Sequence, residues 1–165
     1  MNQALASVHF HAGAGCPSEL DRSRLAREFA ALLAHFPRTV ARVDAQLVGD
    51  EAMDAAHRRY SNIAGTTDVL SFPAHNQLDP SASVEVDLII CTEVAAREAA
   101  ARGHAIEREI LLYAVHGTLH ACGYRDDTEP AAAAIHAEED RVLTAAGIGS
   151  VYAVPPRETP REPLS

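Results

Sequence analysis

The sequence predicts a single α+β domain in which one four-stranded mixed sheet is covered by about five helices. The chain of 165 residues has the length of one ordinary domain with a sizeable core. Apolar residues alternate with polar ones over short stretches typical of strands, and they recur at helical spacing over longer ones. These segments follow the order strand, helix, strand, helix, strand, strand and three helices, with no internal repeat.

The first half of the chain contains two strand–helix pairs. An alternating stretch that ends in glycine predicts the first strand, and leucines at helical spacing predict the helix after it. Ser18 or Asp21 is in place to cap that helix. A second alternating stretch runs into a Gly-Asp turn, and an aspartate opens the next helical segment. The four elements are expected at residues 6–13, 16–37, 39–50 and 50–62.

Two strands and three helices are predicted for the second half. Pro73 ends a β-rich stretch, and the strand after it becomes continuously apolar, as a buried central strand does. Thr92 is the expected cap of an alanine-rich helix that ends at Gly103. The next helix is apolar on most sides and is expected to be central, and the last carries Pro130 in its first turn. The five elements are expected at residues 68–74, 84–92, 93–103, 105–123 and 129–147.

The composition limits the classes of protein to consider. We expect residues 1–153 to form the domain, and residues 154–165, which are proline-rich and charged, to be a disordered tail. No apolar run has the length of a membrane span and the start lacks a secretory signal, so a cytoplasmic protein without a membrane partner is expected. The net charge of −9 argues against tight, non-specific binding of nucleic acid, because phosphate contacts need local positive charge.

The stretch HGTLHACGYRDD contains the residues that point to chemistry. His116 and His120 are four residues apart, so on a helix their rings lie about 40° apart and about 6 Å along the axis, and both can reach one ion. Gly123 is expected to end the helix in a left-handed conformation, after which Asp126 or Asp127 can fold back as a third ligand. Three protein ligands and a water are the arrangement of a catalytic zinc site.

Other interpretations of these residues stay open. A histidine and an aspartate at a helix end can serve capping and solvation alone. Gly117 stands where an HExxH zinc peptidase has its glutamate base, which disfavours peptidase chemistry. Glu109 lies seven residues before His116 on the same helical face, either as a partner that orients a ring or, as we prefer, as an exposed carboxylate. His9 and His11 share a strand face without an obvious third ligand.

Three separate motifs are similar to those of one known family. HGTLHACGYRDD resembles the HGxLHLxGYDH signature of the YbeY family, which comprises single-strand-specific endoribonucleases that mature ribosomal RNA. TTDVLSFP at residues 66–73 resembles the family's PTDVLSFP strand, and VDLIIC at residues 86–91 resembles its GDIVIC strand. The three motifs have the family's order and spacing, so the resemblance covers roughly residues 40–145.

The resemblance implies one Zn²⁺ bound in an H-x3-H-x5-H pattern. The first two positions fall on His116 and His120, but the third falls on Asp126 where the family has a histidine. Aspartate is a competent zinc ligand and makes the site more oxygen-rich, with Asp127 as the alternative.

A family arginine that meets phosphate is also replaced. It follows a tyrosine in the family, and the matching residue after Tyr60 is Ser61. Arg58 and Arg59 are adjacent and can grip phosphate oxygens, so Arg59 is our candidate for substrate binding, with a solvated helix surface as the alternative.

The function implied by the resemblance is a zinc-dependent, single-strand-specific endoribonuclease. It would act in maturation of the 3′ end of small-subunit ribosomal RNA and in ribosome quality control, with ribosomal RNA, the small subunit and its proteins as partners. The acidic charge suggests that ribosomal surfaces deliver the substrate. Two alternatives are a non-catalytic ribosome-assembly factor with a structural metal and a metal-dependent hydrolase of another substrate. The sequence does not determine the oligomeric state.

Overall fold

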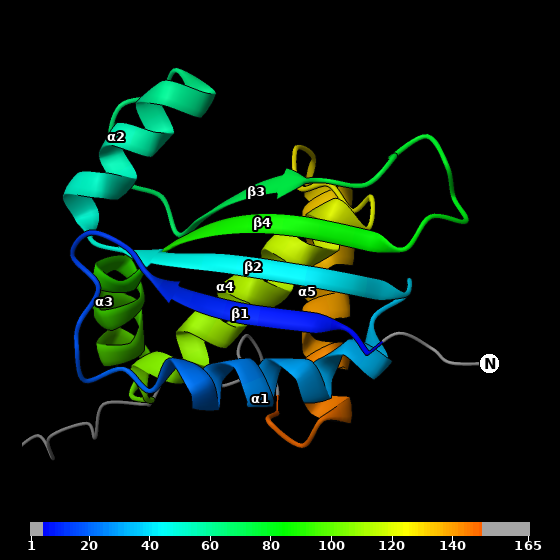
Figure 1. The fold of residues 1–165 in the computed structure, drawn as a ribbon, viewed down its shortest axis with the longest axis horizontal. Helices are drawn as coiled ribbons and strands as arrows, with labels where there is room; N and C mark the ends of the chain where they lie inside the picture. Colours follow the sequence, from blue (N-terminus) through cyan, green and yellow to red (C-terminus); the bar gives the residue numbers. More distant parts are fainter. Residues whose placement is uncertain (1–4, 150–165) are drawn as a thin grey trace, which may run out of the picture.

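The computed structural model describes residues 5–149, which form a four-stranded sheet and five α-helices (Figure 1). The expected disordered tail, residues 154–165, lies outside the described residues. The elements are β1 (Ser7–Ala12), α1 (Arg22–Leu32), a 3₁₀ turn (Leu33–His35), β2 (Val40–Val48), α2 (Asp50–Ser61), β3 (Val69–Pro73), β4 (Val84–Cys91), α3 (Thr92–Arg102), α4 (Ile106–Ala121) and α5 (Glu129–Ala145).

The sheet is mixed, as the sequence predicts, with the strand order β1-β2-β4-β3. β1 is parallel to β2 and β2 is parallel to β4, whereas the edge strand β3 is antiparallel to β4. β4 is therefore paired on both sides, and its alternate residues Val84, Val86, Leu88 and Ile90 are buried. This agrees with the expectation of a buried central strand.

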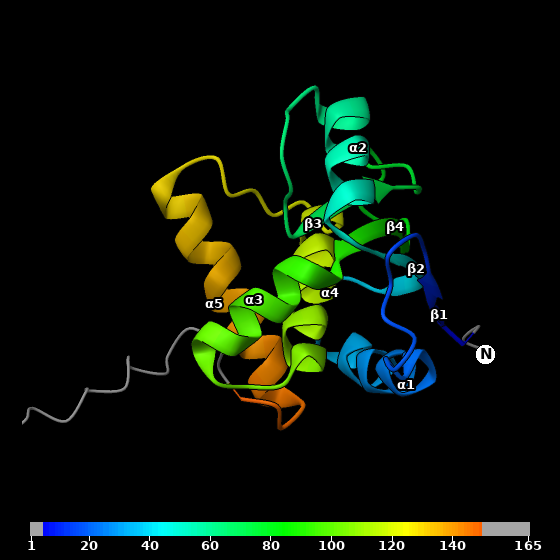
Figure 2. The ribbon, with the colours of Figure 1, turned by 90° about the vertical axis from the view of Figure 1, so that its left-hand side faces the viewer.

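The hydrophobic core lies between one face of the sheet and the helices α1 and α4, with α5 packed on the outer side of α4 (Figure 2). α4 is buried over most of its circumference, as its continuous apolar pattern predicts. It crosses beneath β3 and β4, so its C-terminal end emerges beside the edge of the sheet. None of the helices in the described part of the chain is long and apolar enough to cross a membrane.

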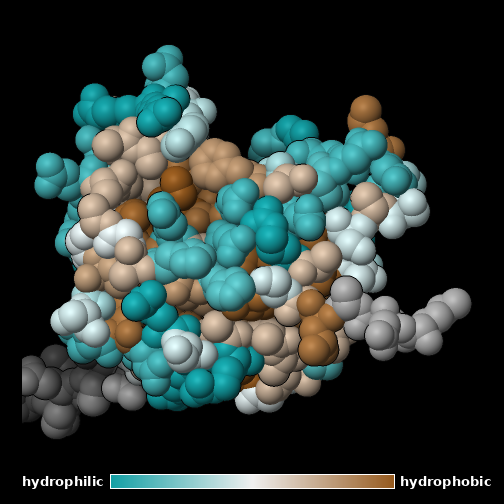
Figure 3. All heavy atoms as spheres, viewed as in Figure 1, coloured by the Kyte–Doolittle hydropathy of each residue, from teal (hydrophilic) through white to brown (hydrophobic). Residues whose placement is uncertain are grey.

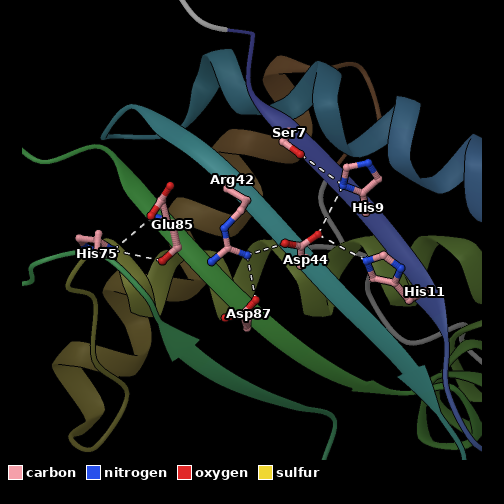
Figure 4. A network of polar contacts seen from close by, with 8 residues as sticks. All are labelled: Ser7, His9, His11, Arg42, Asp44, His75, Glu85 and Asp87. Carbon is pink, nitrogen blue, oxygen red and sulfur yellow. Dashed lines mark hydrogen bonds and ion pairs between the residues drawn. The ribbon is translucent and has the colours of Figure 1, made fainter.

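The opposite face of the sheet, which we call the open face, is covered by a helix only at one end, where α2 lies (Figures 1 and 2). Its middle is polar (Figure 3). Arg42 bonds Asp44 and, at 2.8 Å, Asp87 of the neighbouring strand (Figure 4). His9 and His11 both lie 3.4 Å from Asp44, which is the acidic neighbour that the sequence did not identify.

One predicted helix cap is confirmed and another is wrong. The Asp21 side chain accepts a hydrogen bond from Arg24 N at 3.0 Å, so α1 begins at Arg22 rather than at residue 16. Thr92 is the first residue of α3 and not its cap. Its buried hydroxyl instead donates to the Val48 carbonyl at 3.1 Å, which ties α3 to β2.

Candidate metal centre

Two half-buried imidazoles from the last turns of α4 face the same point. His116 and His120 have ring centroids 4.5 Å apart, and their Nε2 atoms are separated by 2.9 Å. Residues four apart on a helix share a face, so this geometry follows from the spacing in the sequence.

A carboxylate from the loop after α4 completes the group. Gly123 has a φ of 107°, a left-handed value that reverses the chain, as the sequence predicts. The reversal brings Asp126 Oδ2 to 3.4 Å from Nε2 of both His116 and His120. Asp127 instead pairs with Arg125 at 2.8 Å. Of the two acids that the sequence left open, the structure therefore brings Asp126 to the histidines.

The hydrogen bonds on the far side of each ring determine which nitrogen faces the centre as an acceptor. His120 Nδ1 lies 2.9 Å from the Tyr124 carbonyl, which can only accept, so Nδ1 carries the proton. His116 Nδ1 is hydrogen-bonded in the same way to the Glu139 carboxylate. In their neutral forms both rings therefore point an Nε2 lone pair at each other and at Asp126. A positive charge shared by these three acceptors, from a metal ion or from a proton on one Nε2, would satisfy them.

The donor set fits a metal ion. Ligand atoms of His116, His120 and Asp126 all lie within 4.8 Å of one another, and no other such group of three occurs within residues 5–149. Two imidazole nitrogens and one carboxylate oxygen suit Zn²⁺ and leave a position for water.

The partner of His116 is a residue that the sequence interpretation missed. Glu139 of α5 is fully buried, and a carboxylate that holds the Nδ1–H of a ligand histidine fixes its tautomer and orientation. The sequence does contain a sign of this role: Glu139 lies at helical spacing between Ile135 and Val142, on the face of α5 that is buried.

Glu109 neither orients a ring of the metal centre nor is exposed, although its position in the sequence suggested one of these roles. It is fully buried and bonds Arg102 at 2.9 Å and His104 at 2.7 Å, far along α4 from the histidines. The expectation of exposure was wrong because α3 packs over this end of α4 and supplies a cation.

Burial and charge act on His116 in opposite directions. Burial disfavours its charged form, but the hydrogen bond and the charge of Glu139, together with the charges of Asp68 and Asp126, outweigh this, so the pKa of His116 lies above its usual value. The surroundings of the ring thus favour a positive charge at this point of the structure.

Gly117 lies where the helix touches the sheet. A Cβ at this position would lie 2.7 Å from Leu88 Cδ2 and 3.2 Å from Val69 Cγ2. Ser71 Oγ also donates to the Gly117 carbonyl at 2.6 Å. The close contact between α4, β3 and β4 therefore leaves no room for the glutamate of an HExxH site.

The TTDVLSFP segment forms one wall of the pocket that contains the three candidate ligands. Thr67, Asp68, Val69, Leu70, Ser71 and Pro73 line this pocket together with His116, His120 and Asp126. Two motifs that are distant in the sequence thus meet at one site.

The substrate-binding candidate Arg59 lies elsewhere. Its guanidinium is 5.4 Å from the ring centroid of Tyr60 at the end of α2, and it is not among the residues that line the metal pocket. The neighbouring Arg58 is paired with Asp54 at 3.1 Å.

The fold and the site define an α+β protein with a candidate metal centre of two histidines and one carboxylate at the end of its central helix. A family model described as Endoribonuclease YbeY matches residues 18–147. The chain belongs to the YbeY family.

Curated relatives of this family agree with the assignment. Endoribonuclease YbeY of Thermobifida fusca is 40% identical over 124 residues, which are 70% of this chain and 77% of the relative. The protein of the same name from Frankia casuarinae is 38% identical over 123 residues, 68% of this chain and 61% of the relative, so the chain spans less than two thirds of that protein. The solution structure of TM1509 from Thermotoga maritima aligns with a TM-score of 0.49 at 16% identity, covering 82% of this chain and 90% of that one.

Proposed function

We propose that the chain is a zinc-dependent endoribonuclease that hydrolyses phosphodiester bonds of single-stranded RNA. The observation that carries the proposal is the convergence of two acceptor nitrogens and one carboxylate oxygen on a single point. Membership of a family whose members are named endoribonuclease supports an RNA substrate.

In the proposed mechanism, His116, His120 and Asp126 would hold one Zn²⁺, and the bound ion would supply Lewis acidity and lower the pKa of a water. Glu139 and the Tyr124 carbonyl keep the two rings in the tautomer that presents Nε2. Asp126 is half-exposed, so the loop that carries it forms the open side through which RNA would enter. Arg59 remains our candidate for binding a phosphate away from the metal.

We further propose that the RNA is small-subunit ribosomal RNA, cut during maturation of its 3′ end, and that the protein also serves ribosome quality control. A net charge of −9 favours delivery of the RNA by the small subunit and its proteins over direct capture. The site of action would then be the cytoplasm, where ribosomes are assembled.

The test compares three substitutions for metal content and for cleavage of a single-stranded RNA carrying the 3′ end of the small-subunit RNA. His120→Ala and Asp126→Ala are expected to lose bound zinc and cleavage together. Asp127→Ala is the matched control, because it removes an acid of the same loop that pairs with Arg125 instead. Asp126→His is expected to retain zinc, since it offers another nitrogen ligand.

The outcomes separate the proposal from its alternatives. A wild-type protein that binds zinc but cleaves no RNA would support an assembly factor with a structural metal. Cleavage of a small ester but not of RNA would support a different hydrolase. A protein that cleaves RNA equally well after His120→Ala would overturn the proposed mechanism.

A further inference from the structure

A hollow on the open face lies beside the C-terminal end of α2 and is separate from the metal pocket. We call it the open-face hollow. It is lined by Tyr60 of α2, Phe72 of β3, Ile89 and Asp87 of β4, and Gln46 and Asp44 of β2. None of its lining residues belongs to the metal pocket.

The apolar end of this hollow is an aromatic pair that remains accessible. The Tyr60 ring packs edge-to-face against Phe72, with centroids 4.9 Å apart, yet 54% of Tyr60 is exposed. Large apolar residues are buried in most folds, and an exposed aromatic in a concave site has the character of a binding surface.

The charged residues near the Tyr60–Phe72 pair favour a nucleobase over a phosphate as the group that binds in the hollow. Asp87, Asp44 and His11 also line the hollow, and Arg42 is hydrogen-bonded to both carboxylates (Figure 4). Two carboxylates share the single positive charge of Arg42, so the group stays acidic and disfavours phosphate, while oxygens not bonded to Arg42 can accept hydrogen bonds from the exocyclic amino groups of bases. Arg59 lies over the Tyr60 ring, and within residues 5–149 no carboxylate is paired with it, so a cation is available beside the hollow for a flanking phosphate.

Strand β3 connects the hollow to the metal pocket. Neighbouring residues of a strand point to opposite faces, about 3.8 Å apart along the chain. Phe72 therefore faces the hollow, whereas Ser71 and Pro73 line the pocket of the candidate metal ligands. The two sites therefore lie on either side of one edge strand, and a single RNA strand that reaches both would pass over this edge.

We propose that the open-face hollow is a nucleobase subsite, in which one base of a single-stranded RNA stacks on the Tyr60–Phe72 pair. This inference rests on the proposed function, because it identifies how the same RNA is held. Bases with amino groups bind better than uracil, because Asp87 and Gln46 offer acceptors at the base edge. Stacking also explains how a strongly acidic chain can hold RNA with few phosphate contacts.

The experiment measures binding of fluorescent ten-nucleotide RNAs by anisotropy in the presence of EDTA, so that neither metal nor cleavage contributes. Tyr60→Ala is expected to weaken binding of oligo(A) by about 5- to 150-fold. Tyr60→Phe keeps the ring and is expected to bind within about twofold of wild type. Ile63→Ala is the matched control, because Ile63 is exposed to 53% but does not line the hollow.

A comparison of ligands tests the same idea without any variant. Oligo(A) is expected to bind more tightly than oligo(U), and both more tightly than an abasic strand of equal length. Equal binding of the abasic strand, or of oligo(A) to folded Tyr60→Ala, would overturn the subsite.

Different results would reject the nuclease proposal and the subsite proposal. Zinc-dependent cleavage by wild type, together with unchanged binding by Tyr60→Ala, would reject the subsite and leave the nuclease. Base-dependent binding without any cleavage would reject the nuclease and leave the subsite.

Discussion

The buried contact between Glu139 and His116 makes a quantitative prediction about Glu139→Gln. Glutamine has the same shape and can still accept the Nδ1–H of His116, but it removes the negative charge behind the ring. That charge makes the imidazole a better ligand and balances the cation it binds. The substitution should therefore weaken metal binding without rebuilding the site.

The expected loss of zinc affinity is about 10- to 100-fold, which corresponds to about 1.4–2.7 kcal/mol. The metal-free protein should lose much less stability. Glu139 is fully buried and its Oε2 has no hydrogen-bond partner within the described chain, so neutralising it also removes an unfavourable buried charge.

Two measurements check this difference. Competition with a coloured chelator reports zinc affinity, and thermal unfolding with and without zinc reports how much the metal stabilises each variant. Glu138→Gln is the matched control, because this neighbouring glutamate pairs with Arg141 at 2.7 Å and not with the histidine. Zinc binding by Glu139→Gln within about twofold of wild type would refute the reasoning. So would a loss of unfolding free energy in the metal-free variant that is as large as its loss of zinc-binding free energy.

Three further predictions concern the stability of the fold. Gly117→Ala should lower the free energy of unfolding by about 1–2 kcal/mol in a denaturant titration, since overpacking against Leu88 exceeds the helix propensity gained; unchanged stability would contradict the close contact. Asp50→Asn should destabilise at pH 7 by about 0.5 kcal/mol, because hydrogen bonds from Arg97 lower the pKa of Asp50 at the start of α2. This stability is present above the pKa of unfolded aspartate and is lost as the pH falls through the folded value, so the gap to wild type should close in acid. Asn62→Gly should leave thermal stability nearly unchanged while Asn62→Val lowers it, because Asn62 has a φ of 55°.

Local sequence determined the helices and strands of this protein and part of its candidate metal centre. Alternation and helical spacing predict the elements, because each strand or helix must turn one face to the core. The pairing of His116 with His120 and the chain reversal at Gly123 are equally local, since the geometry of one helix and one glycine decides them.

The tertiary structure decided what depends on contacts between distant elements. Asp126 faces the histidines whereas Asp127 pairs with Arg125, and two adjacent acids look alike in a sequence. Glu139 reaches His116 only because α5 packs along α4, and Glu109 is buried only because α3 covers it. The sequence does not distinguish one carboxylate from another. Only the packing around it determines whether it is solvated, paired with a cation or hydrogen-bonded to a histidine that binds metal.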